Sequence, residues 1–230
     1  MNKEWSEKNK QMQILLKKAT FSCGIKKLIE LRNIFMAEMQ SWKEILLPED
    51  YYKMPYMNAN GYHNKTIAYS IWHIMRIEDI VVNTLILNRD EILFRDEFIR
   101  KINAPAITTG NELVKEEIAE FSKMLNLDAL YNYAEVVKKN TDEWLFSISY
   151  EDVKRKFTEA DKQRILDLRV VSESESAIWL IDYWCDKDIK GIIKMPLSRH
   201  WIMHIEAANR IKDKLLEKCR YSYFRKRTEV

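Results

Sequence analysis

The stretch IKKLIELRNIFMAEMQSWKEILL, residues 25–47, decides the fold class of this chain. Its large apolar residues recur at spacings of three and four, which places them on one face of an α-helix. They are Leu28, Leu31, Phe35, Met39, Trp42 and Leu46. Pro48 follows, and we expect it to end the helix because proline disfavours helix in the residue before it.

The same periodicity predicts three further long helices, over residues 66–88, over residues 128–149, and from Pro196 and Ser198 to about Lys218. Between them lie a turn-rich stretch, a crossover and a mixed region. Shorter helices are expected at 8–19, 94–102, 112–126 and 177–185. Four long helices with two long crossovers predict a bundle whose core is built from facing apolar stripes.

The composition points to the same class. The chain has 230 residues, of which 47% are hydrophobic and 32% charged, and only four are Gly and four Pro. The usual shares are about 7% Gly and about 5% Pro, and strands joined by tight turns need that chemistry. We therefore predict an all-α protein with one domain over residues 1–230, a core over about 25–218 and a basic C-terminal tail over 219–230.

Charge and cysteine content bear on partners and location. The net charge of +3 comes from the segment between Arg210 and Arg227, which has eight basic and two acidic residues. Basic residues at a helix end suit its dipole, so nucleic-acid binding is not expected, although binding through the tail stays an alternative. The three cysteines have no Cys-x-x-Cys spacing, the N-terminus has no signal-peptide core, and no apolar run approaches the ~20 residues of a membrane span. These features predict a cytoplasmic protein with no membrane segment.

Three of the four histidines are candidate metal ligands. His200 and His204 are four residues apart, so on a helix their rings lie on the same face. His73 falls on the apolar stripe of another predicted helix and faces the interior. Three imidazoles with an open position describe a catalytic metal site, although a buried structural histidine has the same pattern. The zincin protease motif is excluded because Trp201, not Glu, follows His200.

Other candidate residues have simpler interpretations. His63 precedes the second helix and is expected to cap it or lie at the surface. Glu78, Asp79 and Glu206 are possible acceptors for the N–H groups of the histidines, but helical spacing takes them off the histidine faces, which favours solvated ion pairs. Nothing except its residue type supports Cys185 as a nucleophile.

Three segments resemble the DinB-like family. Thr66–Asn83, with His73 inside it, is similar to the second helix of that family. Leu127–Leu145 is similar to its third helix, and Pro196–His204 resembles its His-x-x-x-His fourth helix. The resemblance covers most of residues 25–218, and it departs at 150–196, which is longer and richer in Trp and charge.

The resemblance implies a four-helix bundle, frequently a homodimer, with a divalent metal held by His73, His200 and His204. It implies Zn²⁺ or Ni²⁺, a small-molecule substrate, and a metal-dependent thiol enzyme like the bacillithiol S-transferases and the mycothiol-dependent isomerase. A hydrolase that activates water is expected as the other use of such a site. The alternative is a metal-free, non-catalytic bundle that acts as a stress-related binding module.

Overall fold

The computed structural model describes the backbone of residues 2–228 and the side chains of residues 2–217. Within that range there are helices and no β-strand, which confirms the predicted all-α class. The α-helices are α1 (Lys3–Leu15), α2 (Phe21–Ile45), α3 (Ile67–Asp79), α4 (Ile92–Arg95), α5 (Phe98–Lys101), α6 (Glu116–Met124), α7 (Leu127–Ser147), α8 (Glu159–Leu168), α9 (Glu175–Cys185), α10 (Ile189–Lys194) and α11 (His200–Thr228). Three short 3-10 helices are η1 (Lys18–Thr20), η2 (Pro48–Tyr52) and η4 (Asp152–Lys154), and two π-helical segments are η3 (Ile80–Ile86) and η5 (Met195–Arg199).

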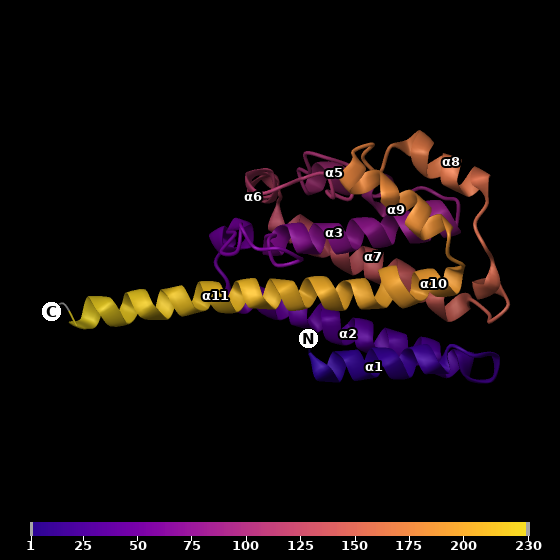
Figure 1. Cartoon of the computed structure of the whole chain (residues 1–230), viewed down its shortest axis with the longest axis horizontal. Coiled ribbons are helices and arrows are strands. Elements are labelled where there is room, and N and C mark those ends of the chain that lie inside the picture. The colour runs from indigo at the N-terminus through magenta and orange to yellow at the C-terminus, as the bar shows by residue number, and fades with distance from the viewer. Residues whose placement is uncertain (1, 229–230) are drawn as a thin grey trace.

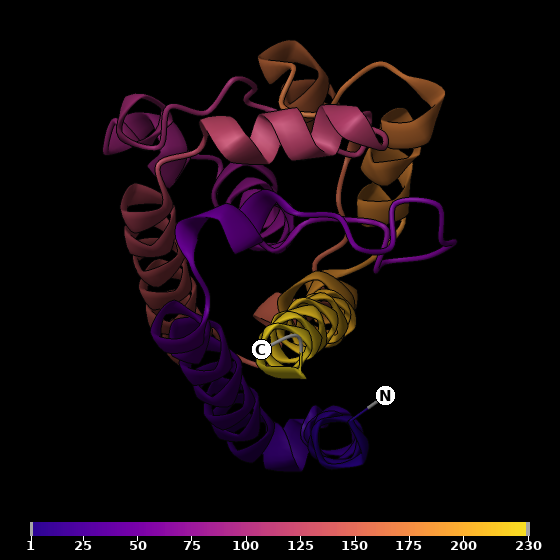
Figure 2. The same cartoon turned by 90° about the vertical axis from the view of Figure 1, so that its left-hand side faces the viewer.

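Four long helices form a ring around the core. Helix α2 contacts α7 and α11, and α3 contacts the same two helices (Figures 1 and 2). Helix α1 packs along the outside of α2, and α8 packs against η3 and α9. The predicted apolar stripe of α2 is buried along its whole length, from Leu28 with no exposed surface to Leu46 at 7%. The architecture is therefore a four-helix bundle with additional helices on two sides.

A buried arginine joins the four helices of the ring. Arg32 of α2 makes two hydrogen bonds to Glu78 of α3, of 2.6 and 2.8 Å, and one of 2.7 Å to Asp142 of α7. It also donates to the carbonyl oxygen of Leu197, in the π segment before α11, over 3.3 Å. Since a guanidinium has five donors in a fixed plane, these contacts fix the spacing of the helices as well as neutralising the charge.

Polar residues set where the helices start. The Thr66 side chain accepts the backbone N–H of Tyr69 and begins α3, and Asn126 does the same for Ala129 at the start of α7. Thr158 and Asp161 form a reciprocal capping box that begins α8. Helix α8 was not predicted, because its ten residues have a single buried side chain, Ile165, and therefore no apolar stripe.

The last long helix starts earlier than Pro196, where the sequence predicts its beginning. Helix α10, η5 and α11 follow one another without a break, so Pro196 lies inside a helical segment. Proline has no N–H and clashes with the preceding turn, and a wider π turn is one way to accommodate it. The N–H of His200 accordingly bonds to the Met195 carbonyl, five residues back. The backbone of α11 also continues past Lys218, to Thr228.

The ends of the chain differ from expectation in detail. Helix α1 begins at Lys3, not near residue 8, and its Trp5 and Met12 are buried in the core ahead of residue 25. The predicted basic tail, 219–230, lies outside the residues whose side chains are described. None of the helices in the described part of the chain is both long and apolar enough to span a bilayer.

Candidate metal centre

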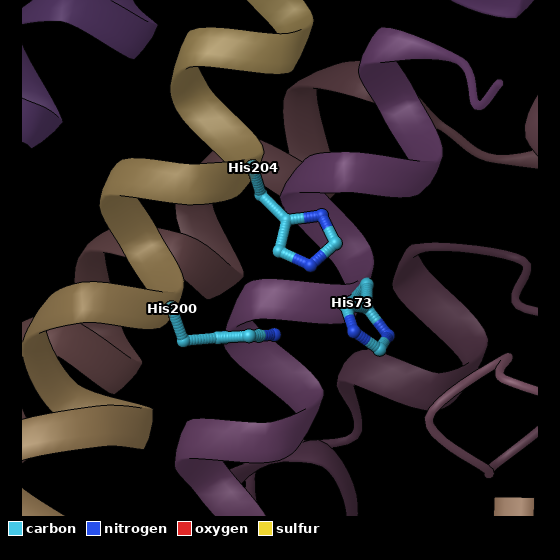
Figure 3. Close-up of side chains that lie close together, drawn as sticks. All are labelled: His73, His200 and His204. Carbon is cyan, nitrogen blue, oxygen red and sulfur yellow. The ribbon is translucent and has the colours of Figure 1, made fainter. Parts of the chain in front are cut away.

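The three histidines of the sequence prediction come together between α3 and α11. Their ring centroids are 5.0 Å apart for His73 and His200, 4.7 Å for His73 and His204, and 4.5 Å for His200 and His204. All three rings are turned toward the space between the two helices (Figure 3). Each side chain is at most 7% exposed, and one nitrogen from each ring lies within 4.8 Å of the other two. The grouping confirms the predicted proximity of these residues.

The orientation of His73 is set by a loop that the sequence analysis did not single out. The Nδ1 atom of His73 lies 2.7 Å from the carbonyl oxygen of Thr109. A carbonyl only accepts, so Nδ1 carries the proton, and the lone pair of the neutral ring is on Nε2. Metal-binding histidines usually have such a partner on the second nitrogen, which fixes the tautomer and the ring plane.

The same loop holds the neighbouring side chains of α3. Trp72 donates to the carbonyl of Thr108 over 3.2 Å, Arg76 to that of Ile107 over 2.6 Å, and the Tyr69 hydroxyl to that of Gly110 over 2.9 Å. The Tyr69 ring is stacked on the His73 ring, with centroids 5.4 Å apart and planes 11° from parallel. One face of α3 is thus tied to four successive carbonyls, and His73 is fixed from two directions.

His200 and His204 lack such partners. The Nδ1 atom of each is buried and makes no hydrogen bond to any described residue. A buried polar nitrogen left unpaired costs about 1–3 kcal/mol, so a histidine with a structural role normally has a partner. His200 and His204 therefore lack the hydrogen bond that fixes the ring of His73, and the fit to a metal ion rests on the three ring nitrogens that lie within 4.8 Å of one another.

Burial keeps the three rings neutral. Loss of hydration lowers the pKa of His73 to about 4, against a rise from the Thr109 hydrogen bond and a further decrease from Lys65. Burial also places the pKa values of His200 and His204 well below the ordinary value, and the neighbouring histidines lower them further. Because metal ligation requires an unprotonated nitrogen, the site has the correct protonation state at neutral pH.

The geometry is close to that of a tetrahedral metal site. With metal–nitrogen distances of about 2.1 Å, the ligand nitrogens of a tetrahedral zinc site lie roughly 3.4 Å apart. The separations of up to 4.8 Å between the histidine nitrogens therefore have to shorten by at most about 1.4 Å.

A pocket of about 250 Å³ opens over the histidines. All three line it, and helix α9, from the 150–196 region, supplies its opposite wall through Trp179, Leu180, Tyr183 and Trp184. Tyr62 also lines it, and the Tyr62 ring meets the His204 ring edge-on at 5.1 Å. Helix α9, within residues 150–196, thus contributes to the lining of the pocket beside the histidines. A larger cavity, of about 520 Å³, is lined by Tyr51 and Tyr131 and has no histidine among its described lining residues.

The sequence predicts that the acidic residues near the site are solvated, but in the structure Glu78 and Asp79 are buried. Glu78 and Asp79 have no exposed surface. Glu78 pairs with Arg32, and Asp79 accepts the N–H groups of Ile92 and Leu93, each over 3.0 Å. The ion pairing was predicted correctly, but the burial was missed because it depends on partners far away in the sequence.

The remaining candidates lie outside the cluster. Glu206 accepts a hydrogen bond from the backbone N–H of Asn2. His63 is partly buried against the edge of Tyr56, with ring centroids 5.4 Å apart. Burial raises the pKa of the Cys185 thiol to about 11, so this residue stays protonated at neutral pH and is a poor nucleophile, in agreement with the sequence analysis.

Comparison with protein-family models found no match to this chain, and a search of curated proteins found none either. The DinB-like resemblance therefore stays a prediction based on the three motifs quoted above.

Proposed function

We propose that this chain is a DinB-like protein that holds Zn²⁺ or Ni²⁺ through His73, His200 and His204 and acts as a metal-dependent thiol S-transferase. The observation that carries the proposal is the convergence of three buried, neutral imidazoles, each with a ring nitrogen within 4.8 Å of the other two. In line with the resemblance, the proposal includes a cytoplasmic homodimer and a small-molecule substrate.

A bound divalent ion at this site would lower the pKa of a coordinated thiol or water, so that a nucleophile forms near neutral pH. The protein's own part is to fix the ligands and to limit access of water. The Thr109 carbonyl holds His73, and the aromatic wall of α9 covers the site on the opposite side.

The lining of the pocket favours thiol transfer over hydrolysis. Among its described lining residues there is no Asp, Glu, Lys or Arg. A bound metal would lower the pKa of water and of a thiol alike. A free thiol starts at a pKa of about 8.5 and water at about 15.7, so the thiol loses its proton more readily where the lining offers no acidic or basic side chain to assist. A low-molecular-weight thiol is therefore the better cosubstrate.

The first test is the metal content of purified protein, measured by elemental mass spectrometry. We expect near-stoichiometric Zn²⁺ or Ni²⁺ in the wild type and its loss in a His200→Ala, His204→Ala double variant. His63→Ala, which removes a histidine outside the cluster, is the matched control and should keep its metal. Circular dichroism would verify that each variant is folded.

If the wild type takes up no metal even after incubation with Zn²⁺ and Ni²⁺, the proposal is wrong. The metal-free bundle with a binding role would then be the better interpretation. Metal that remains in the double variant would place the binding site elsewhere in the chain.

A further inference from the structure

The wall that α9 places opposite the histidines is aromatic. Trp179, Tyr183 and Trp184 line the pocket from this helix, and Trp179 and Tyr183, four residues apart, share one face of it. Trp184 is buried, whereas Trp179 is 48% exposed. Tyr62, on a separate loop, is 46% exposed and also lines the pocket. The pocket therefore has a buried aromatic floor and half-exposed aromatic residues toward solvent.

The exposed indole is fixed in place. Trp179 Nε1 donates to the Ser176 carbonyl over 2.9 Å, and the ring meets Tyr183 edge-on, with centroids 5.7 Å apart. On the other side of Tyr183, the Lys187 ammonium lies 3.4 Å from the ring centroid and donates to the Tyr183 carbonyl. A large aromatic surface that is held rigid while half exposed loses little conformational entropy on binding a ligand.

The pocket selects by shape and apolar surface, because its lining residues, all within the described part of the chain, include no carboxylate and no Lys or Arg. Its volume of about 250 Å³ is just below the ~300–1,000 Å³ of sites for drug-sized ligands. That volume suits a molecule with one or two rings. The aromatic side chains that line the pocket favour a ligand with an aromatic ring, because two such rings attract each other in edge-to-face contact.

We propose that the substrate of this site is an uncharged small molecule that carries an aromatic ring next to its reactive group, and that Trp179 determines this specificity. The inference rests on the proposed function in one respect, since it places the ring beside the metal ligands. Binding of the ring itself depends only on the pocket, so it is testable with and without metal.

The test compares thiols of different size by isothermal titration calorimetry on Zn²⁺-loaded protein. We expect benzyl mercaptan to bind at least tenfold more tightly than 2-mercaptoethanol. Trp179→Ala should reduce this preference by roughly two- to tenfold, the range expected for one aromatic contact, because it weakens binding of benzyl mercaptan more than that of 2-mercaptoethanol. Trp179→Phe should keep most of the preference. Phe146→Ala, which removes an exposed aromatic residue of α7 that does not line the pocket, is the control.

A second arm uses metal-free protein and 1-naphthol, an uncharged aromatic probe, with the same variants. If no metal binds but the probe binds in a Trp179-dependent way, the proposed function fails and the aromatic pocket stands. If metal binds but the two thiols bind equally, or Trp179→Ala weakens both to the same degree, the inference is wrong and the metal site stands.

Discussion

Gly110 gives the sharpest test of how the candidate metal site is built. Its φ of +79° is in the left-handed region, and a Cβ placed on it would lie 2.9 Å from Cε2 of Tyr69. Tyr69 is buried and stacked on His73, so its ring has no room to turn away. In a Gly110→Ala variant the loop itself therefore has to shift, and the Thr109 carbonyl that orients His73 moves with it.

The size of the effect follows from two contributions. The left-handed conformation costs an alanine about 1–2 kcal/mol, and overpacking against a buried ring typically costs about 1–3 kcal/mol. We expect Gly110→Ala to lower the free energy of unfolding by about 2–5 kcal/mol in urea denaturation of metal-free protein. Loss of the partner that orients a metal ligand typically weakens metal binding about 10- to 100-fold, measured here by competition with a chromophoric chelator.

Gly61 provides a control for the backbone contribution. Its φ is +97°, but a Cβ there would meet nothing nearer than a His63 ring atom at 3.8 Å. Gly61→Ala should therefore lose only the backbone contribution, about 1–2 kcal/mol. If both variants lose the same stability, the contact with Tyr69 does not matter. If Gly110→Ala is destabilised but binds Zn²⁺ as tightly as the wild type, the Thr109 carbonyl does not position His73.

Two further predictions concern buried charge. Glu78→Gln should lower the free energy of unfolding by about 3–5 kcal/mol, because it leaves the Arg32 charge buried and only partly paired. Glu30→Gln breaks an exposed pair and should cost at most about 1 kcal/mol, so equal losses in urea denaturation would contradict the role given to burial. Metal-free protein should also lose stability as the pH falls from about 6.5 toward 4. In this range the histidines of the unfolded chain take up protons, whereas the buried histidines of the folded chain do not, since burial lowers the pKa of His73 to about 4. The slope should reach about 1.4 kcal/mol per pH unit for each histidine and be smaller in the histidine double variant.

The sequence predicts most of the bundle because its helices carry regular apolar stripes. The stripe from Leu28 to Leu46 is buried as expected. The same reasoning placed His73 on an interior face and put His200 and His204 on one face of another helix, so the convergence of the three was predictable. Helix α8, which has no stripe, and the helical segment before Pro196 were not predictable in this way.

The contacts that hold the site in position could not be derived from helical spacing. The partner of His73 is Thr109, which is 36 residues away, and Arg32 lies 46 residues from Glu78 and 110 from Asp142. Each contact depends on how separate helices and loops pack, which a local pattern does not specify. One local signal was present: Gly110 is one of only four glycines in the chain. A rare glycine in an otherwise helical chain indicates a backbone position that other residues tolerate poorly.

The buried ion pairs explain why the histidines converge without help from a metal. Glu78 follows His73 on α3 by five residues, and it accepts a 2.9 Å hydrogen bond from Nε1 of Trp201, the residue next to His200 on α11. Arg32 binds the same carboxylate and lies over the Trp201 ring, with its Cζ atom 4.8 Å from the ring centroid. The two helices that carry the candidate ligands are thus joined less than two turns from the site. Since the packing already sets their separation, the entropy of bringing the two helices together is already lost on folding.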